Sequence, residues 1–67
     1  MKPKRYRPMD NLKWLRVQAG LLQSELAKLV GVSGEQISHY ETGFARPRSE
    51  ILRRIAKVLH VTIEDLF

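Results

Sequence analysis

Apolar residues recur at helical spacing on both sides of a glycine within residues 23–40, QSELAKLVGVSGEQISHY. The apolar positions before the glycine are Leu26, Ala27 and Val30, and those after it are Val32, Ile37 and Tyr40. Because residues three and four apart share one side of a helix, this spacing predicts two short amphipathic helices. Gly31 interrupts the pattern and predicts a tight turn between them.

Three further helices are predicted around this pair. The first covers residues 10–19, with Asp10 able to cap it and Gly20 ending it. The last is brief and opens on a cap formed by Thr62 and Asp65. The apolar residues expected to face inward are Leu12, Leu15 and Ala19 in the first helix, Ile51, Leu52, Ile55, Ala56 and Leu59 in the fourth, and Ile63, Leu66 and Phe67 in the fifth. Since no segment alternates with a period of two, we predict an all-α fold, a compact five-helix bundle.

A capping box sets the register of the third helix. The Ser33 hydroxyl can accept from an amide of the first turn, while the Gln36 side chain reaches back to the Ser33 backbone. The helix is therefore predicted over residues 33–42, with Ile37 and Tyr40 turned toward the core. The residues turned outward are Gly34, Glu35, Ser38 and His39. Two helices in this arrangement are typical of a helix-turn-helix, so the first hypothesis is DNA binding.

Basic residues outnumber acidic ones, and their distribution is uneven. The formal net charge is +5 and the pI is near 10.1, which favours a polyanionic partner without establishing one. The first eight positions contain Lys2, Lys4, Arg5 and Arg7 together with Pro3 and Pro8. We interpret residues 1–9 as a flexible basic arm and residues 10–67 as the folded domain. Two roles stay open for the arm, a solvated tail and a segment that contacts DNA.

Length and composition exclude several classes of function. A chain of 67 residues forms one domain without room for a deep catalytic cleft. It contains no cysteine and two histidines, so we expect no disulfide, metal site or cofactor. Ser33, His39 and His60 lack the arrangement that nucleophilic catalysis needs, and we expect no enzyme activity. No apolar run reaches the ~18 residues of a membrane span, so we expect a soluble, cytoplasmic protein.

A longer series of spaced residues runs from Leu12 to Phe67. Its members are Leu12, Leu15, Arg16, Gly20, Leu21, Gln23, Glu25, Leu26, Ala27, Gly31, Val32, Ser33, Ile37, Ser38, Glu41, Gly43, Pro47, Ile55, Ala56, Val61, Asp65, Leu66 and Phe67. In this order they resemble the Cro/repressor-type helix-turn-helix family, also called Xre-type, which includes the lambdoid phage repressors. The resemblance implies a lambda-repressor-like fold whose third helix enters the major groove of double-stranded DNA.

The resemblance also implies which side chains contact DNA. Glu35, Ser38 and His39 would read base edges, and Gly34, which has no side chain, would let the backbone approach the DNA. Contacts to the DNA backbone are implied at Gln23, Gln36, Thr42, Gly43 and Arg46. Arg16 and Glu41 are implied to form a partly buried ion pair with a structural role. For Glu35 and His39 the alternatives are a charge that favours the helix N-terminus and a surface residue without contacts.

The chain departs from the family pattern at several positions. Leu22 replaces the usual Thr or Ser cap of the second helix, so that cap is missing. Phe44 and Ala45 stand where the loop after the third helix is often basic. Arg48 occupies the usual cap position of the fourth helix. Trp14 lies outside the inward stripe of the first helix, where it either packs on a neighbouring segment or belongs to a protein interface.

The expected function is that of a sequence-specific transcriptional regulator, and a repressor in particular. So short a chain makes few contacts, so we expect a homodimer on a near-palindromic operator. Family analogy places the dimer surface in residues 60–67. The alternative is a protein-interaction module or antitoxin of the same fold, controlled by a partner protein, with Trp14 and Phe44 in the contact patch. The two functions can be distinguished by changing Glu35 and His39, which should abolish DNA binding while binding of the partner protein remains.

Overall fold

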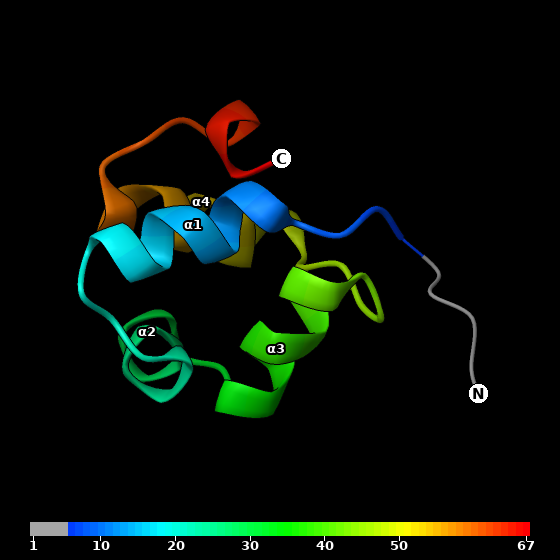
Figure 1. Cartoon of the computed structure of the whole chain (residues 1–67), viewed down its shortest axis with the longest axis horizontal. Coiled ribbons are helices and arrows are strands. Elements are labelled where there is room, and N and C mark those ends of the chain that lie inside the picture. The colour runs from blue at the N-terminus through cyan, green and yellow to red at the C-terminus, as the bar shows by residue number, and fades with distance from the viewer. Residues whose placement is uncertain (1–5) are drawn as a thin grey trace.

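The computed structural model describes residues 6–67, which form four α-helices and one short 3₁₀ turn. The elements are α1 (Asp10–Gln18), α2 (Gln23–Val30), α3 (Gly34–Thr42), α4 (Ser49–Leu59) and the 3₁₀ turn η1 (Glu64–Leu66). The described residues contain no strand, and the prediction of an all-α fold is confirmed. In Figure 1, α1, α4 and η1 lie on one side of the molecule, and α2 and α3 lie on the other.

The predicted fifth helix is a single 3₁₀ turn, so the five-helix count is not confirmed. The predicted cap does form, because the Thr62 amide donates to Asp65 Oδ2 at 3.0 Å. Beyond it the hydrogen bonds span three residues, as from the Leu66 amide to the Ile63 carbonyl oxygen at 3.1 Å. One such turn is enough to bury Leu66 completely, while Ile63 and Phe67 stay partly exposed.

The core draws apolar side chains from all four helices and from the segments at either end. Its buried members are Met9, Leu12, Leu26, Ala27, Val30, Ile37, Tyr40, Leu52, Ile55, Ala56 and Leu66. All except Met9 are positions that the apolar pattern assigned to the interior. The most extensive packing between helices joins α2 to α3, the two halves of the predicted helix-turn-helix.

Residues 6–9 belong to the fold, which corrects the arm predicted over residues 1–9. Met9 is 1% exposed. The Tyr6 amide donates to the Gly43 carbonyl oxygen at 3.0 Å, and the Met9 amide donates to the Tyr40 carbonyl oxygen at 3.4 Å. These bonds hold the segment along the C-terminal end of α3. Most basic residues of the predicted arm lie outside the described residues, namely Lys2, Lys4 and Arg5.

The first helix begins and ends differently from the prediction. Asp10 is its first residue and not its cap, because the N-cap position is taken by the buried Met9. The helix ends at Gln18, and Ala19, which was predicted to face inward, is exposed. Arg16 is buried instead. A charged side chain at this position was not part of the apolar stripe, and its burial depends on a partner from another helix.

Candidate nucleic-acid interface

One side of α3 is fixed against the core, and its register is set at the N-terminus. Ser33 Oγ accepts from the Gln36 amide at 3.1 Å, and Gln36 Oε1 accepts from the Ser33 amide at 3.0 Å. The predicted capping box is confirmed. Ile37 and Tyr40 are buried beneath the helix. Since the register is fixed from both the cap and the core, the side chains of the outer surface have defined positions.

The outer side of α3 carries three of the predicted base-reading residues. Glu35 is exposed, and Ser38 and His39 are half-buried. Residues at spacings of three and four share one side of a helix, so these side chains form a single row. A carboxylate, a hydroxyl and an imidazole are the groups that can exchange hydrogen bonds with base edges in the major groove.

Gly34 lies where α3 crosses α2. A Cβ atom added at Gly34 would lie 3.5 Å from the Cα of Ser24, in α2. This direction points toward the crossing of α2 and α3 and away from the outer row. A Cβ at Gly34 would thus face the packing of the two helices, and the approach of the Gly34 backbone to DNA stays a prediction.

His39 is in contact with an aromatic residue of the following loop. The ring centroids of His39 and Phe44 are 5.9 Å apart, and the ring planes meet at 73°. Phe44 is 41% exposed. Sequence reasoning placed both residues at the surface and missed their contact. The signal available was the glycine that ends α3 between them, since a left-handed residue reverses the chain direction.

A buried ion pair joins α1 to α3. Arg16 Nε lies 2.7 Å from Glu41 Oε2, and Arg16 Nη2 donates to Glu41 Oε1 at 3.3 Å. Arg16 Nη1 also donates to the Leu21 carbonyl oxygen at 2.7 Å. The two residues are 7% and 5% exposed. This two-pronged geometry, with a further carbonyl on the guanidinium, offsets the cost of removing both charges from water.

The N-terminus of α2 is held by side chains of the protein itself. Gln23, its first residue, donates from Nε2 to Glu41 Oε1 at 2.9 Å. Leu22 has no side-chain acceptor, as expected, but its amide donates to Glu25 Oε1 at 2.8 Å. This bond is half of a capping box, and the half that an N-cap hydroxyl would supply is missing. Gln23, which was expected at a phosphate, is thus bonded to α3 through one hydrogen of its side-chain amide. The same amide nitrogen carries a second hydrogen.

Thr42 and Gly43, at the C-terminal end of α3, make hydrogen bonds within the protein. The Thr42 hydroxyl donates to the Ser38 carbonyl oxygen at 3.0 Å, within its own helix. The Gly43 amide donates to the His39 carbonyl oxygen at 3.0 Å, and its carbonyl accepts from Tyr6. Gly43 is also buried, and the contact of its backbone with DNA stays a prediction.

Arg46 turns toward the C-terminal segment. Its guanidinium carbon lies 5.3 Å from the centre of the Phe67 ring. Together they line an open hollow whose other walls are Tyr6, Arg7, Met9 and Ala45. A cation over an aromatic face is a favourable contact.

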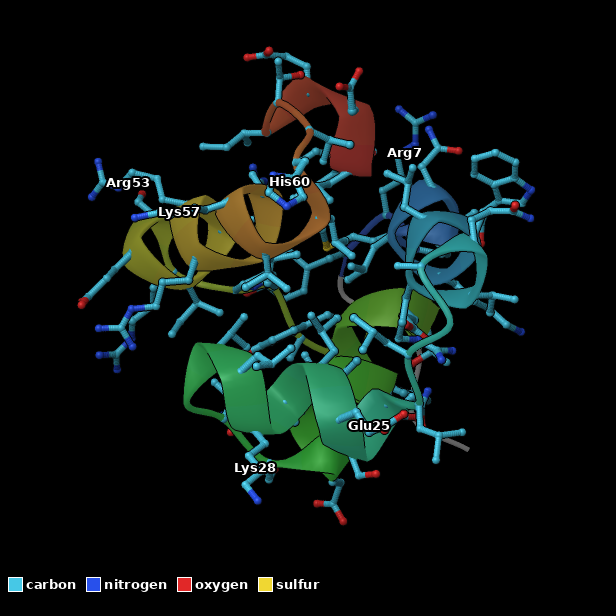
Figure 2. The ribbon with its side chains drawn as sticks, turned by 90° about the vertical axis from the view of Figure 1, so that its left-hand side faces the viewer. Arg7, Glu25, Lys28, Arg53, Lys57 and His60 are labelled. Carbon is cyan, nitrogen blue, oxygen red and sulfur yellow. The ribbon has the colours of Figure 1, made fainter. Side chains whose placement is uncertain are left out.

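Basic side chains project from several sides of the molecule. Figure 2 shows Arg53 and Lys57 leaving α4 on one side, Lys28 leaving α2 on another, and Arg7 near η1. Arg54 is engaged by Glu50, with 2.7 Å between Nη2 and Oε1. The positive charge is therefore spread around the fold, and it favours approach to a polyanion in general without marking the recognition surface.

Tyr40 is a titratable residue of the core that is 5% exposed. Burial raises the pKa of its hydroxyl above the usual value, and the nearby Arg48 guanidinium opposes this shift more weakly. Residues 6–67 contain no group of three or more His, Cys, Asp or Glu side chains that could hold a metal ion. Nor does any helix of this part of the chain have the length and apolarity to cross a membrane.

The fold and the outer row of α3 define a small all-α protein built around a helix-turn-helix. A family model described as helix-turn-helix matches residues 12–66. The chain therefore belongs to the Xre-type helix-turn-helix family, as its sequence indicated.

Relatives occur in archaea and bacteria. One from Archaeoglobus fulgidus is 41% identical over 56 residues, which cover 84% of this chain and 80% of the relative. One from Methanocaldococcus jannaschii is 40% identical over 58 residues, which cover 87% of this chain and 88% of the relative. Both are described as uncharacterised HTH-type transcriptional regulators. The HTH-type transcriptional activator BcrR of Enterococcus faecalis is 39% identical over 57 residues, 85% of this chain but 28% of that protein.

A solved structure with the same arrangement is that of the restriction-modification controller protein C.AhdI from Aeromonas hydrophila. It superimposes with a TM-score of 0.79 at 28% sequence identity, over 87% of this chain and 88% of the controller protein. The match extends over nearly the whole of both chains, so the similarity includes the segments around the helix-turn-helix as well as the motif itself.

Proposed function

We propose that this protein, a DNA-binding transcriptional regulator of the Xre-type family, reads specific double-stranded sequences with α3. The observation that carries the proposal is the row of Glu35, Ser38 and His39 on the outer side of a helix whose register is fixed from two sides. Glu35 accepts a hydrogen bond from cytosine N4, and His39 bonds to a purine N7. Ser38 bonds to either type of base edge.

Contacts to the DNA backbone come from the N-terminal ends of the two motif helices. Gln23 keeps one amide hydrogen for a phosphate while the other holds Glu41. Gln36 uses its oxygen in the capping box, which leaves its amide nitrogen for the same role. The amides of a helix N-terminus attract a phosphate in any case. Such contacts place α3 in the groove but carry no sequence information.

The regulator acts in the cytoplasm as a homodimer on a near-palindromic operator and represses transcription by occupying it. A two-fold dimer places its recognition helices in half-sites about 34 Å apart, one turn of the duplex. Pairing doubles the base contacts that one short chain makes. A reporter gene whose promoter overlaps the selected operator tests the direction of control, and higher expression in the presence of the protein would rule out repression.

In-vitro selection of bound duplexes at two salt concentrations tests DNA reading. We expect one enriched sequence for the wild type and a changed preference at particular base pairs for Glu35→Ala and His39→Ala. Gln23→Ala should weaken all duplexes about equally. Thermal unfolding of each variant controls for loss of fold. If the wild type enriches no sequence and Glu35→Ala behaves identically, sequence-specific regulation is ruled out.

A second function, binding of a regulatory partner protein, is favoured by an apolar surface on α1. Trp14 and Val17 are 61% and 55% exposed and lie one turn apart on the same side of that helix. A partner that covers this surface could control DNA binding without touching α3. Trp14→Ala should then abolish partner binding while duplex preference stays unchanged. Loss of both activities with Glu35→Ala would instead assign them to one surface.

A further inference from the structure

We propose that Phe44 determines base preference by holding the His39 imidazole in one orientation. The inference rests on the proposed reading of DNA by α3. The two rings meet at 73° with 5.9 Å between their centres, which is the edge-to-face arrangement that aromatic pairs favour. The contact places an apolar side chain of the loop directly beside a polar side chain of the recognition row.

The backbone around Phe44 brings its ring back to His39. The carbonyl oxygen of His39 accepts from the Gly43 amide at 3.0 Å and from the Ala45 amide at 3.3 Å. Phe44 lies between these two donors. Because both neighbours are bonded to the same residue of α3, the loop folds over the last turn of the helix, and the Phe44 ring stays within reach of His39.

The turn before Phe44 is fixed from its other side as well. Gly43 has a φ of +90°, and a Cβ atom at this position would lie 2.4 Å from the Tyr6 carbonyl oxygen. The Tyr6 amide in turn donates to the Gly43 carbonyl oxygen. The N-terminal segment therefore packs against the turn. The loop cannot move outward as a unit without breaking these contacts.

An ordered imidazole discriminates better between bases than a freely rotating one. A side chain that binds a base edge loses rotamer freedom, and this loss weakens the contact unless the side chain is already held. His39 is half-buried and Phe44 remains 41% exposed, so the pair leaves the imidazole open to solvent while restricting its rotation. Phe44 thus acts as a positioning residue for His39.

Measured affinities of single and double variants test this role. The readout is the dissociation constant for a duplex changed at the base pair whose preference depends on His39, divided by the dissociation constant for the selected duplex. Phe44→Ala should lower this ratio by about two- to tenfold, the range expected for loss of an edge-to-face pair. Phe44→Tyr, which keeps the ring, should preserve it. In a His39→Ala background, Phe44→Ala should change the ratio no further.

Leu29→Ala is the matched control, because Leu29 is a large apolar residue of α2 that is 59% exposed and takes no part in the His39 contact. It should leave the ratio unchanged, and thermal unfolding verifies that every variant is folded. An unchanged ratio for Phe44→Ala would overturn the inference, and so would an equal loss in the His39→Ala background. If the wild type selects no duplex at all, the proposed function fails first, and the two failures are thereby distinguished.

Discussion

Gln23 donates a hydrogen bond from its amide nitrogen to Oε1 of Glu41, at 2.9 Å. The same carboxylate accepts from Arg16 through both of its oxygens. One buried carboxylate of α3 therefore holds the N-terminus of α2 and a guanidinium of α1. The relative placement of the two motif helices depends on this junction as well as on the apolar packing between them.

Removal of the carboxylate should be costly. Glu41→Ala leaves the Arg16 guanidinium buried without its counter-charge, and we expect a loss of about 3–5 kcal/mol in the free energy of unfolding. The double variant Arg16→Met/Glu41→Leu removes both charges and should lose less than Glu41→Ala alone. Urea denaturation measures all three proteins. A double variant that is as unstable as Glu41→Ala, or more so, would contradict this account.

Gly43 should tolerate substitution much less than Gly20, although both have a positive φ. A residue with a Cβ atom costs about 1–2 kcal/mol in this conformation at either site. At Gly20 the new atom meets nothing within 4 Å, whereas at Gly43 it meets the Tyr6 carbonyl oxygen at 2.4 Å. We expect Gly43→Ala to lose about 1–3 kcal/mol more than Gly20→Ala. Equal losses in urea denaturation would mean that residues 6–9 are not held against the turn.

A hydroxyl at residue 22 should complete the cap of α2. Leu22 has the extended backbone of an N-cap, with φ −73° and ψ 160°, close to the φ −84° and ψ 157° of Ser33. Its side chain is 65% exposed, so little burial is lost on replacement. Leu22→Ser should therefore stabilise the protein by about 0.5–2 kcal/mol, and Ser33→Ala should destabilise it by a similar amount. Thermal unfolding that shifts in the same direction for both variants would contradict the comparison.

Tyr40 should make the protein less stable in strong alkali. Burial raises the pKa of its hydroxyl above the usual value of 10.0. The unfolded state then loses the proton first as the pH rises, and the folded state is disfavoured. The contribution of the Tyr40 hydroxyl to stability is fully present below its pKa in the unfolded state, and it is lost as the pH rises through its pKa in the folded state. Between about pH 9 and 11, the free energy of unfolding should fall more steeply for the wild type than for Tyr40→Phe.

Gly34→Ala should be tolerated or stabilising. The position is helical, and the new Cβ atom would lie in ordinary contact with Ser24, 3.5 Å from its Cα. Replacing a helical glycine with alanine reduces the freedom of the unfolded chain and gains about 0.4–1 kcal/mol. Because the methyl group points toward α2, duplex affinity should change little. If Gly34→Ala is stable but binds DNA much more weakly, Gly34 lies at the DNA surface.

Much of the fold could be predicted because most elements carry their own local signals. Ile37 and Tyr40 were correctly assigned to the core, since the Ser33 cap sets the helix register without any distant contact. Met9 could not be recognised in this way. It belongs to no periodic segment, and its burial depends on hydrogen bonds that residues 6–9 make with α3.

The candidate site could be predicted only in part. The outer positions of Glu35 and Ser38 follow from helical spacing alone. The direction of Gly34 depends on how α2 crosses α3, and the neighbour of His39 depends on how the chain turns at Gly43. Neither is a property of one helix, so neither can be read from periodicity.

The amino-acid sequence by itself determined the helices, their inward sides and membership of the Xre-type family, because caps and apolar spacing act within a few residues. The tertiary structure alone decided three contacts between side chains of the candidate site and its surroundings. It brought Gln23 to Glu41, Phe44 to His39 and Arg46 to Phe67. Each of these contacts joins separate elements or a helix to its loop, and its geometry depends on how the packed elements are placed relative to one another.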